Sequence, residues 1–267
     1  MQLPSAVRNH SDLRAPKGIV YGPPGIGKTT FGAGTIRPLL IDCENGANHV
    51  HCDRTPYLSD WPSIQQWLTA LAAGGHAYGT VVVDSVDWLL RRAEEYVSGV
   101  DGTVAGMKQT LNRSHGGYGN GKQVLRNHVY QYLLPTLDRM VNAGVAVVLL
   151  AHATRREITM LDGVTVEKSA PEIHLDLANT MIEWSDFVGA AGRGADGREL
   201  RLCETGQLLA KNRYGIEQVL PLSWQALLAA MGDGDPGEDT NLPDRQAGPP
   251  PSAPETATAP ETPNQEN

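Results

Sequence analysis

The chain has 267 residues, which is long enough for one large domain with a buried core. Apolar residues make up 40% of it, but no apolar run approaches the roughly 20 residues needed to cross a bilayer. Its three cysteines are too few and too scattered for a disulfide framework, and no apolar signal segment follows the N-terminal charges. These features exclude a membrane-spanning or disulfide-stapled protein and predict a cytoplasmic one.

The net charge of −8 is unevenly distributed. Residues 232–267 hold eight acidic residues and one arginine, a charge of −7, which leaves only about −1 for residues 1–231. A nearly neutral body can still hold a local basic groove, so the charge does not exclude nucleic acid. The acidic segment is rich in proline and almost free of large apolar residues, which predicts a disordered tail.

After a polar lead-in over residues 1–16, continuous apolar runs alternate with segments of helical spacing between residues 17 and 231. This alternation indicates an α/β domain with a mostly parallel central sheet flanked by helices. Two polar stretches interrupt it: we expect a mobile loop at 98–122 and a β-ribbon at 153–172. The expected strands are Lys17–Tyr21, Pro38–Asp42, Thr80–Asp84, Val145–Ala151, Phe187–Ala191, Glu199–Cys203 and Gln207–Lys211, and the expected helices begin near Lys28 and cover Trp61–Ala73, Trp88–Val97 and Val124–Asn142, the last kinked at Pro135.

The first expected strand leads into GPPGIGKTT, which matches the phosphate-binding pattern G-x4-G-K-[ST]. The pattern stands between a strand and a helix, where its glycines let backbone N–H groups turn inward around phosphate oxygens. We therefore expect ATP and Mg²⁺ to bind here, with Lys28 reaching the β- and γ-phosphates and Thr29 ligating the metal. The candidate nucleotide site consists of Gly22, Pro23, Pro24, Gly25, Ile26, Gly27, Lys28, Thr29 and Thr30.

Two further strands lead into acidic residues that suit nucleotide hydrolysis. Asp84 closes the apolar run VVVD, where it would hold Mg²⁺ through a water, or would serve only as a helix N-cap. Glu44 follows the strand Pro38–Asp42 and would orient the attacking water. The spacing of Glu44 fits a solvated loop acid equally well.

Together with the phosphate loop, these acids and Lys211-Asn212-Arg213 resemble the core of RecA-type recombinases. The chain further resembles the small phage-encoded ATPases of the Sak group, which are RecA-like single-strand annealing proteins. This likeness covers about residues 15–228 and implies a RecA-like ATPase domain over 17–231. It is carried by GGYG at 116–119, LLAHA at 149–153, EWSDFV at 183–188 and KNRYG at 211–215.

The resemblance implies a role for each of these residues. Glu44 would be the catalytic glutamate, and His152 would sense the γ-phosphate and couple it to a DNA-binding loop. Lys211 and Arg213 would reach the nucleotide of an adjacent subunit and stabilise transition-state charge, which implies a homo-oligomer, either a filament or a ring. From the residues alone, His152 could equally be a strand-end histidine with a backbone partner. Lys211 and Arg213 could equally be solvated charges at a strand edge.

The two polar stretches correspond to the segments where the resembled family binds single-stranded DNA. Cations there would follow the DNA phosphates and Tyr118 would stack on a base, although solvated loop charges would look the same. The candidate DNA contacts are Lys108, Arg113, His115, Tyr118 and Lys122 in the first stretch and Arg155, Arg156 and Lys168 in the second.

Three functions fit these observations. The leading hypothesis is a DNA-dependent ATPase that anneals or pairs single-stranded DNA in phage-type recombination or replication, with a single-strand binding protein as a candidate partner. The second is a P-loop ATPase of another class, such as a helicase loader or a small-molecule kinase, although no lid is evident. The third is a nucleotide-dependent interaction module that works through the acidic tail, which would otherwise only solubilise the chain.

Overall fold

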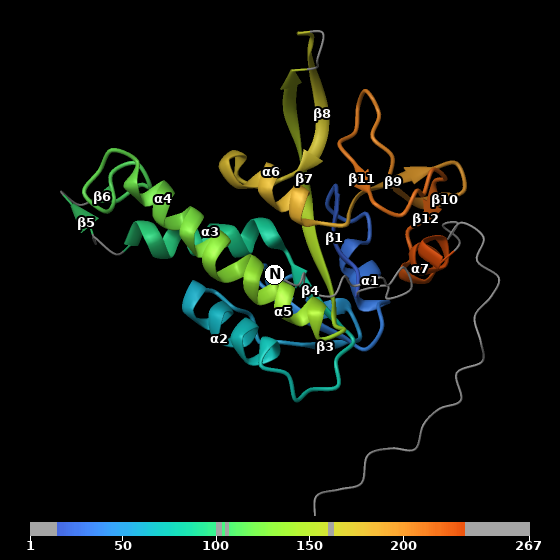
Figure 1. Cartoon of the computed structure of the whole chain (residues 1–267), viewed down its shortest axis with the longest axis horizontal. Helices are drawn as coiled ribbons and strands as arrows, with labels where there is room; N and C mark the ends of the chain where they lie inside the picture. Colours follow the sequence, from blue (N-terminus) through green and yellow to red (C-terminus); the bar gives the residue numbers. More distant parts are fainter. Residues whose placement is uncertain (1–14, 100–102, 105–106, 160–162, 233–267) are drawn as a thin grey trace, which may run out of the picture. The chain divides into compact units, whose positions relative to one another are not determined.

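The computed structural model describes residues 15–99, 103–104, 107–159 and 163–232. Nearly all of the predicted lead-in and tail therefore lie outside the described residues. The rest forms an α/β domain around a sheet with the strand order β12-β10-β9-β1-β7-β4-β2-β3 (Figure 1). No helix among the described residues is long and apolar enough to cross a membrane.

The centre of the sheet is parallel, as predicted. Strands β9, β1, β7, β4, β2 and β3 run in one direction, and β10 and β12 add an antiparallel edge beyond β9. Side chains of the central strands are buried on both faces, which explains their unbroken apolar runs. The strands are β1 (Lys17–Gly22), β2 (Pro38–Asp42), β3 (Asp53–Arg54), β4 (Thr80–Asp84), β7 (Ala146–Thr159), β9 (Phe187–Gly194), β10 (Gly197–Arg201) and β12 (Leu220–Pro221).

Helices cover both faces of the sheet, so the predicted fold class is confirmed. Ile19 and Tyr21 of β1 point into one apolar core, whereas Val20 between them points into the other. The first core is covered by α2 (Trp61–Ala72), α3 (Val86–Gly99), α4 (Asn120–Asn127), α5 (Leu134–Asn142) and α6 (Leu175–Trp184), and the second by α1 (Lys28–Ala33) and α7 (Trp224–Gly232).

The long helix predicted over Val124–Asn142 is present but begins earlier, at Asn120. Its irregular section lies on the N-terminal side of Pro135, where His128–Leu133 forms a π-helical segment, η2. Proline has no N–H, so the carbonyl four residues earlier, that of Gln131, loses its α-helical partner. The wider π turn accommodates this loss, whereas the sequence pattern predicted a kink only.

The polar stretch at 153–172 is a β-ribbon, as expected. Strand β7 continues past the sheet and pairs antiparallel with β8 (Thr165–Pro171) to form a hairpin that projects from the body (Figure 1). The stretch at 98–122 contains a short pair of strands, β5 (Thr103–Val104) and β6 (Met107–Lys108), followed by turns. A short 3₁₀ turn, η1, covers Ala47–His49.

The last third of the domain contains the largest differences from the expected elements. Helices α6 and α7 were not predicted, and the expected strand Gln207–Lys211 is reduced to β11 (Lys211–Asn212). Both missed helices are 10 residues or shorter, and α7 is apolar enough to be read as part of the core. Short, mostly apolar segments do not reveal their periodicity, so helix and strand are hard to tell apart.

Candidate nucleotide site

The phosphate loop joins β1 to α1 at the carboxyl edge of the parallel strands. Gly25 and Gly27 have φ of 73° and 106°, a backbone conformation that disfavours residues with a Cβ. The Lys28 side chain is buried and its Nζ donates to the carbonyl oxygens of Gly22, at 2.9 Å, and Pro23, at 3.2 Å. Lys28 therefore lies across the loop, with its ammonium where loop-bound phosphate oxygens would compete for the same hydrogen bonds.

Thr29 and Asp84, the two residues predicted to hold the metal, meet at the base of the loop. Thr29 Oγ1 donates to Asp84 Oδ2 at 2.7 Å, and Asp84 is only 6% exposed. Burial, together with the nearby carboxylates of Glu44 and Asp42, raises the pKa of Asp84 to about 6, against the opposing effects of the Thr29 hydrogen bond and the Lys28 charge. A cation at this point would relieve the cost of the ionised form, so the residues fit Mg²⁺.

Burial also lowers the pKa of Lys28, against the opposing pull of the carboxylates of Asp84, Glu44 and Asp87. The loop lysine is thus surrounded by three acids in a partly dehydrated pocket. Such a lysine gains most when a polyanion replaces the water that burial has removed. The electrostatics of the loop therefore suit a phosphate chain with its metal ion.

Glu44 is held in place by the residue at the end of β2. Asp42 Oδ1 accepts hydrogen bonds from the backbone N–H groups of Glu44, at 3.2 Å, and Asn45, at 2.6 Å. This turn directs Glu44 toward β7, where its Oε1 lies 3.5 Å from Nε2 of His152. The two predicted catalytic residues are therefore brought together, although 108 positions separate them in the sequence.

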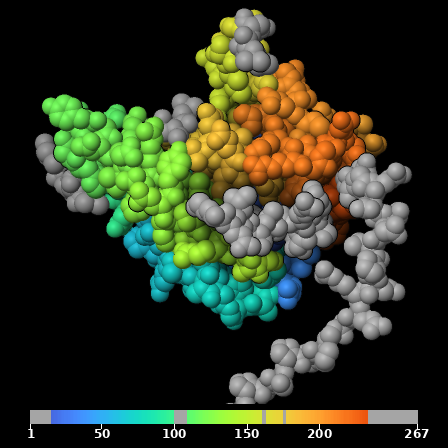
Figure 2. Space-filling view, viewed as in Figure 1, coloured from blue at the N-terminus to red at the C-terminus, as the bar shows by residue number. Residues whose placement is uncertain are grey.

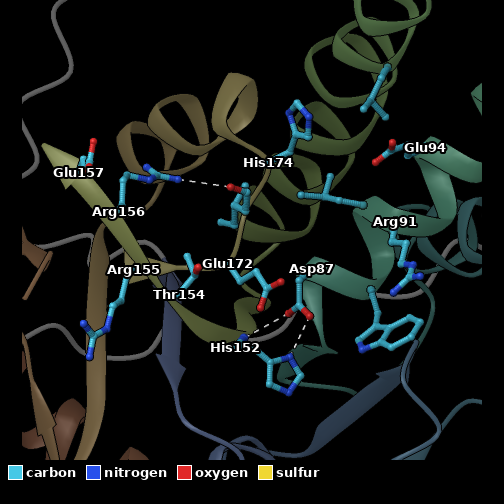
Figure 3. Close-up of a pocket in the computed structure, with 14 residues that line it drawn as sticks. Asp87, Arg91, Glu94, His152, Thr154, Arg155, Arg156, Glu157, Glu172 and His174 are labelled. Atoms are coloured by element: carbon cyan, nitrogen blue, oxygen red, sulfur yellow. Dashed lines mark hydrogen bonds and ion pairs between the residues drawn. The ribbon is translucent and has the colours of Figure 1, made fainter. Parts of the chain in front are cut away.

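His152 is anchored by an acid that the sequence reasoning missed. Its Nδ1 and its backbone N lie 2.8 and 3.2 Å from the two carboxylate oxygens of Asp87 (Figure 3). Asp87 lies in the first turn of α3, three residues after Asp84, whereas the expected helix began at Trp88. The spacing of Asp87, about one helical turn after Asp84, is the sequence feature that could have predicted its place beside the site.

Glu172 completes a group of three possible ligand residues. One ligand atom each of Asp87, His152 and Glu172 lies within 4.8 Å of the others, and among the described residues this group is close enough to share a metal ion. A cavity of about 960 Å³ opens beside it and follows the base of the hairpin (Figure 3). Its wall is mixed in charge rather than basic, because Asp87, Glu94, Glu157 and Glu172 face Arg91, Arg155 and Arg156.

The cationic pair predicted to act on a neighbouring subunit is satisfied within the chain. Lys211 Nζ donates to the carbonyl oxygens of Ile182, Glu183 and Ser185, at 2.8, 2.9 and 2.8 Å. An ammonium group has three N–H donors, and all three are used at the C-terminal end of α6. Lys211 thus caps the end of α6 in this chain, and its role as a cationic finger toward another subunit stays a prediction.

Arg213 is less firmly held than Lys211. Its guanidinium pairs with Asp186 at 2.9 Å and donates to the carbonyl of Glu183, and its side chain remains 54% exposed. Exposed ion pairs of this kind contribute little to stability. Arg213 therefore keeps the freedom that a residue reaching another subunit would need.

The predicted DNA contacts of the second polar stretch lie on the hairpin, but in three different environments. Arg155 is on the surface, with a side chain 80% exposed and paired to Glu167. Arg156 is half-buried and donates to the carbonyl of Ile173, and burial lowers its pKa. Lys168 is 2% exposed and bonded to Glu204, so it is a buried structural cation and not a free contact for DNA phosphates.

The first polar stretch presents its candidates on the turns before α4 and at the start of that helix. Tyr118 is fully exposed in a left-handed backbone conformation, Arg113 is exposed, and Lys122 is partly buried in α4. His115 is partly buried and its Nε2 contacts the carbonyl of Val97. The side chain of Lys108 lies outside the described residues.

The strand–loop–helix geometry and the pairing of Thr29 with Asp84 define the protein as a P-loop NTPase. Residues 14–214, most of the chain, match the family model of the AAA domain, and the chain belongs to that family of P-loop ATPases. A search among curated proteins found no match. The ATPase class predicted from the phosphate loop is therefore confirmed.

Proposed function

We propose that this chain is a RecA-like ATPase, akin to the Sak group, that anneals or pairs single-stranded DNA in phage-type recombination or replication. The observation that carries the proposal is the course of β7. This strand contains His152 of the nucleotide site and continues without a break into the projecting hairpin with Arg155 and Arg156. One strand thus joins the nucleotide site to a projecting hairpin that carries the exposed cation of Arg155.

The nucleotide half of the proposal is supported by the loop and its acids. Gly22–Thr30 would hold the phosphates of ATP, and Thr29 and Asp84 would hold Mg²⁺. Bound Mg²⁺ would neutralise charge that develops on the transferred phosphoryl group. The Lys28 ammonium would leave the carbonyls of Gly22 and Pro23 for phosphate oxygens, because an ammonium binds a negatively charged acceptor more strongly than a neutral one.

Hydrolysis would depend on Glu44 as the residue that orients the attacking water and accepts its proton. Asp42 fixes the turn that carries Glu44, and Asp87 fixes the ring of His152 through Nδ1. The other ring nitrogen is thereby directed at the Glu44 carboxylate. Any movement of Glu44 on hydrolysis would therefore be felt first by His152.

The coupling to DNA would run along β7. Residues from Ala153 to Thr159 lie beyond the last β7 residue that pairs with β1 and form a ladder with β8, so the hairpin can follow small changes at its base. Figure 2 shows the hairpin standing clear of the surrounding surface. Arg155 and the exposed ring of Tyr118 supply the two kinds of contact that single-stranded DNA needs, a cation for phosphate and a stacking face for a base.

Assembly into a filament or ring remains part of the proposal, with Arg213 in place of Lys211 as the residue that reaches a neighbour. Lys211 has no free donor, whereas the Arg213 guanidinium is held by a surface ion pair that a phosphate could replace.

The test is salt-dependent binding of a fluorescent oligonucleotide and ATP turnover with and without that DNA. We expect DNA to stimulate turnover, and Arg155→Ala to weaken binding several-fold and reduce the salt slope by about 0.7, the value for one phosphate contact on a single strand. Arg139→Ala is the matched control, because Arg139 is exposed on α5, at the other end of β7. Turnover unaffected by DNA, together with no salt-sensitive binding, would contradict the DNA half and leave the ATPase assignment intact.

A further inference from the structure

The histidine and the two acids at the base of the hairpin form a group that the proposed hydrolysis uses only in part. Asp87 comes from the first turn of α3, His152 from β7, and Glu172 follows the last residue of β8. One ligand atom of each lies within 4.8 Å of the others. Figure 3 shows the carboxylates of Asp87 and Glu172 directed toward each other beside the ring of His152. Three elements that are far apart in the chain thus bring metal-binding side chains to one point.

Backbone hydrogen bonds hold both acids next to the histidine. Asp87 Oδ1 accepts from the N–H of His152 at 3.2 Å, and the N–H of Glu172 donates to the carbonyl of His152 at 2.8 Å. Because the backbone occupies Oδ1 of Asp87, Oδ2 is the oxygen that faces Nδ1 of the ring, at 2.8 Å. Side chains that are already held in this way lose little freedom when they bind an ion.

Glu172 is the member of the group that has no part in the proposed hydrolysis. Its side chain is exposed, and among the described residues its carboxylate forms no hydrogen bond or ion pair, although Arg155 and Arg156 line the same cavity. Arg155 pairs with Glu167 instead, and Arg156 donates to the carbonyl of Ile173. Glu172 therefore keeps its carboxylate oxygens for a ligand from outside the chain.

The donor atoms select the class of ion. Two carboxylates and a neutral imidazole carry two negative charges, which match a divalent cation. Mg²⁺ and Ca²⁺ are held by oxygen ligands, whereas Zn²⁺ binds imidazole nitrogen as well as carboxylate oxygen. Three protein ligands leave a fourth position on the ion, and the adjoining cavity of about 960 Å³ has room for a water there.

We propose that Asp87, His152 and Glu172 bind Zn²⁺, or another divalent ion that takes nitrogen and oxygen ligands, and that the bound ion inhibits ATP hydrolysis. This site is separate from the predicted Mg²⁺ site at the phosphate loop. Ion binding stands apart from the proposed function, whereas the inhibition rests on the role proposed there for Glu44.

The inhibition follows from the position of the imidazole proton. A neutral His152 that donates from Nδ1 to Asp87 presents the lone pair of Nε2 to Glu44, 3.5 Å away. An ion on Nδ1 takes the place of that proton, and the neutral ring then carries its one proton on Nε2. The Nε2–H group would donate to Glu44 and occupy the carboxylate that has to accept a proton from the attacking water.

Calorimetric titration of the full chain with Zn²⁺, without nucleotide and with Mg²⁺ in excess, tests the site. Glu172→Ala should weaken zinc binding about 100-fold, because loss of a ligand costs at least as much as loss of a residue that orients one. The matched control is Glu157→Ala. Glu157 is an exposed acid that lines the same cavity outside the group, so this variant should bind zinc normally. Equal zinc affinities in the wild type and both variants would overturn the site.

Co²⁺ in place of zinc identifies the donor atoms on the unaltered chain. Imidazole and carboxylate ligands give only weak visible absorption, whereas a thiolate ligand adds an intense charge-transfer band in the near ultraviolet. We expect a cobalt complex without that band, and added zinc should abolish its visible absorption. A charge-transfer band would place the ion on one of the free cysteines and overturn the proposal.

Steady-state hydrolysis in excess Mg²⁺ tests the inhibition. Zinc at a concentration that saturates the site should lower wild-type turnover about tenfold, whereas Glu172→Ala should hydrolyse ATP like the wild type without zinc and keep that turnover when zinc is added. Equal inhibition of the two proteins would place the inhibiting ion at the nucleotide and overturn this half of the proposal. A wild-type chain without any turnover would overturn the proposed function and the inhibition with it, while calorimetry still decides the site.

Discussion

The phosphate loop and the segment Lys211–Arg213 contain lysines that were predicted to act on the same phosphates, and the structure treats them differently. Lys28 Nζ donates to two loop carbonyls, so at least one of its N–H groups remains for another acceptor. Lys211 Nζ donates to three carbonyls at the end of a helix and has none left. A lysine on a ligand-binding loop and a lysine that caps a helix can look alike in a sequence motif.

The acids around each lysine sharpen the contrast. Three carboxylates, those of Asp84, Glu44 and Asp87, oppose the effect of burial on the pKa of Lys28. Burial also lowers the pKa of Lys211, and Arg213 lowers it further. The loop thus collects negative charge that a metal ion and a phosphate chain can balance, whereas in the later segment the end of α6 balances Lys211 and Asp186 balances Arg213.

Glu44→Gln is the change with the largest expected effect. Glutamine keeps the shape of the side chain and the backbone turn at Asp42, but it cannot accept a proton from water. Turnover should fall by ~10²–10⁴-fold while MgATP binding stays within a few-fold of wild type. Steady-state hydrolysis and calorimetry measure the two quantities. Loss of both together would make Glu44 a structural residue.

Lys28→Ala should weaken MgATP binding about 100-fold, because the variant loses charged hydrogen bonds to the phosphates. Calorimetry on the folded protein checks this. The companion variant is Lys211→Ala, the same chemical change in the other segment, and its folded fraction should bind MgATP normally. If the two variants lost the same affinity, the distinction drawn between the two lysines would be wrong.

Lys211→Ala should instead lower the free energy of unfolding by about 2 kcal/mol, since three carbonyls of α6 lose a charged donor. Arg213→Ala is the control, because its exposed ion pair with Asp186 should contribute less than about 1 kcal/mol. Urea unfolding curves fitted with one common slope measure the free energies of unfolding of the two variants. Unchanged stability of Lys211→Ala, combined with a loss of turnover only at concentrations where the protein assembles, would restore the cationic-finger role.

The sequence was sufficient to predict that the phosphate loop, Asp84, Glu44 and His152 lie together, because each stands at or just beyond the carboxyl end of a buried parallel stretch. The carboxyl ends of such strands meet at one edge of the sheet, so residues far apart in the chain become neighbours. Asp87 was missed because its role depends on where α3 begins. The helix begins at Val86, two residues before the expected start at Trp88. This difference places Asp87 in the first turn, where it contacts His152.

The contacts of Lys211 and Lys168 could not be predicted for a different reason. Each depends on an element that the sequence did not reveal or did not connect, the end of α6 for Lys211 and Glu204 for Lys168. Lys168 is an example of the general difficulty, because a lysine on a polar stretch is usually exposed. Burial against a distant acid is a tertiary property that no local pattern records.

The pH dependence of Asp84 gives the most gradual expected effect and tests the acid cluster directly. The folded-state pKa of Asp84, about 6, lies above the ordinary aspartate value of 3.8, so between these values the native protein holds a proton that the unfolded chain has released. This contribution is fully present below the lower value and is lost as the pH rises through the higher one. Metal-free wild-type protein should therefore lose stability relative to Asp84→Asn between about pH 4 and 6, by no more than about 1.4 kcal/mol per pH unit, and the difference should level off above that range. Urea unfolding of both proteins across this range measures the difference. A constant difference would show that Asp84 is ionised in the folded chain throughout, and the crowding of carboxylates at the loop would then be weaker than the geometry indicates.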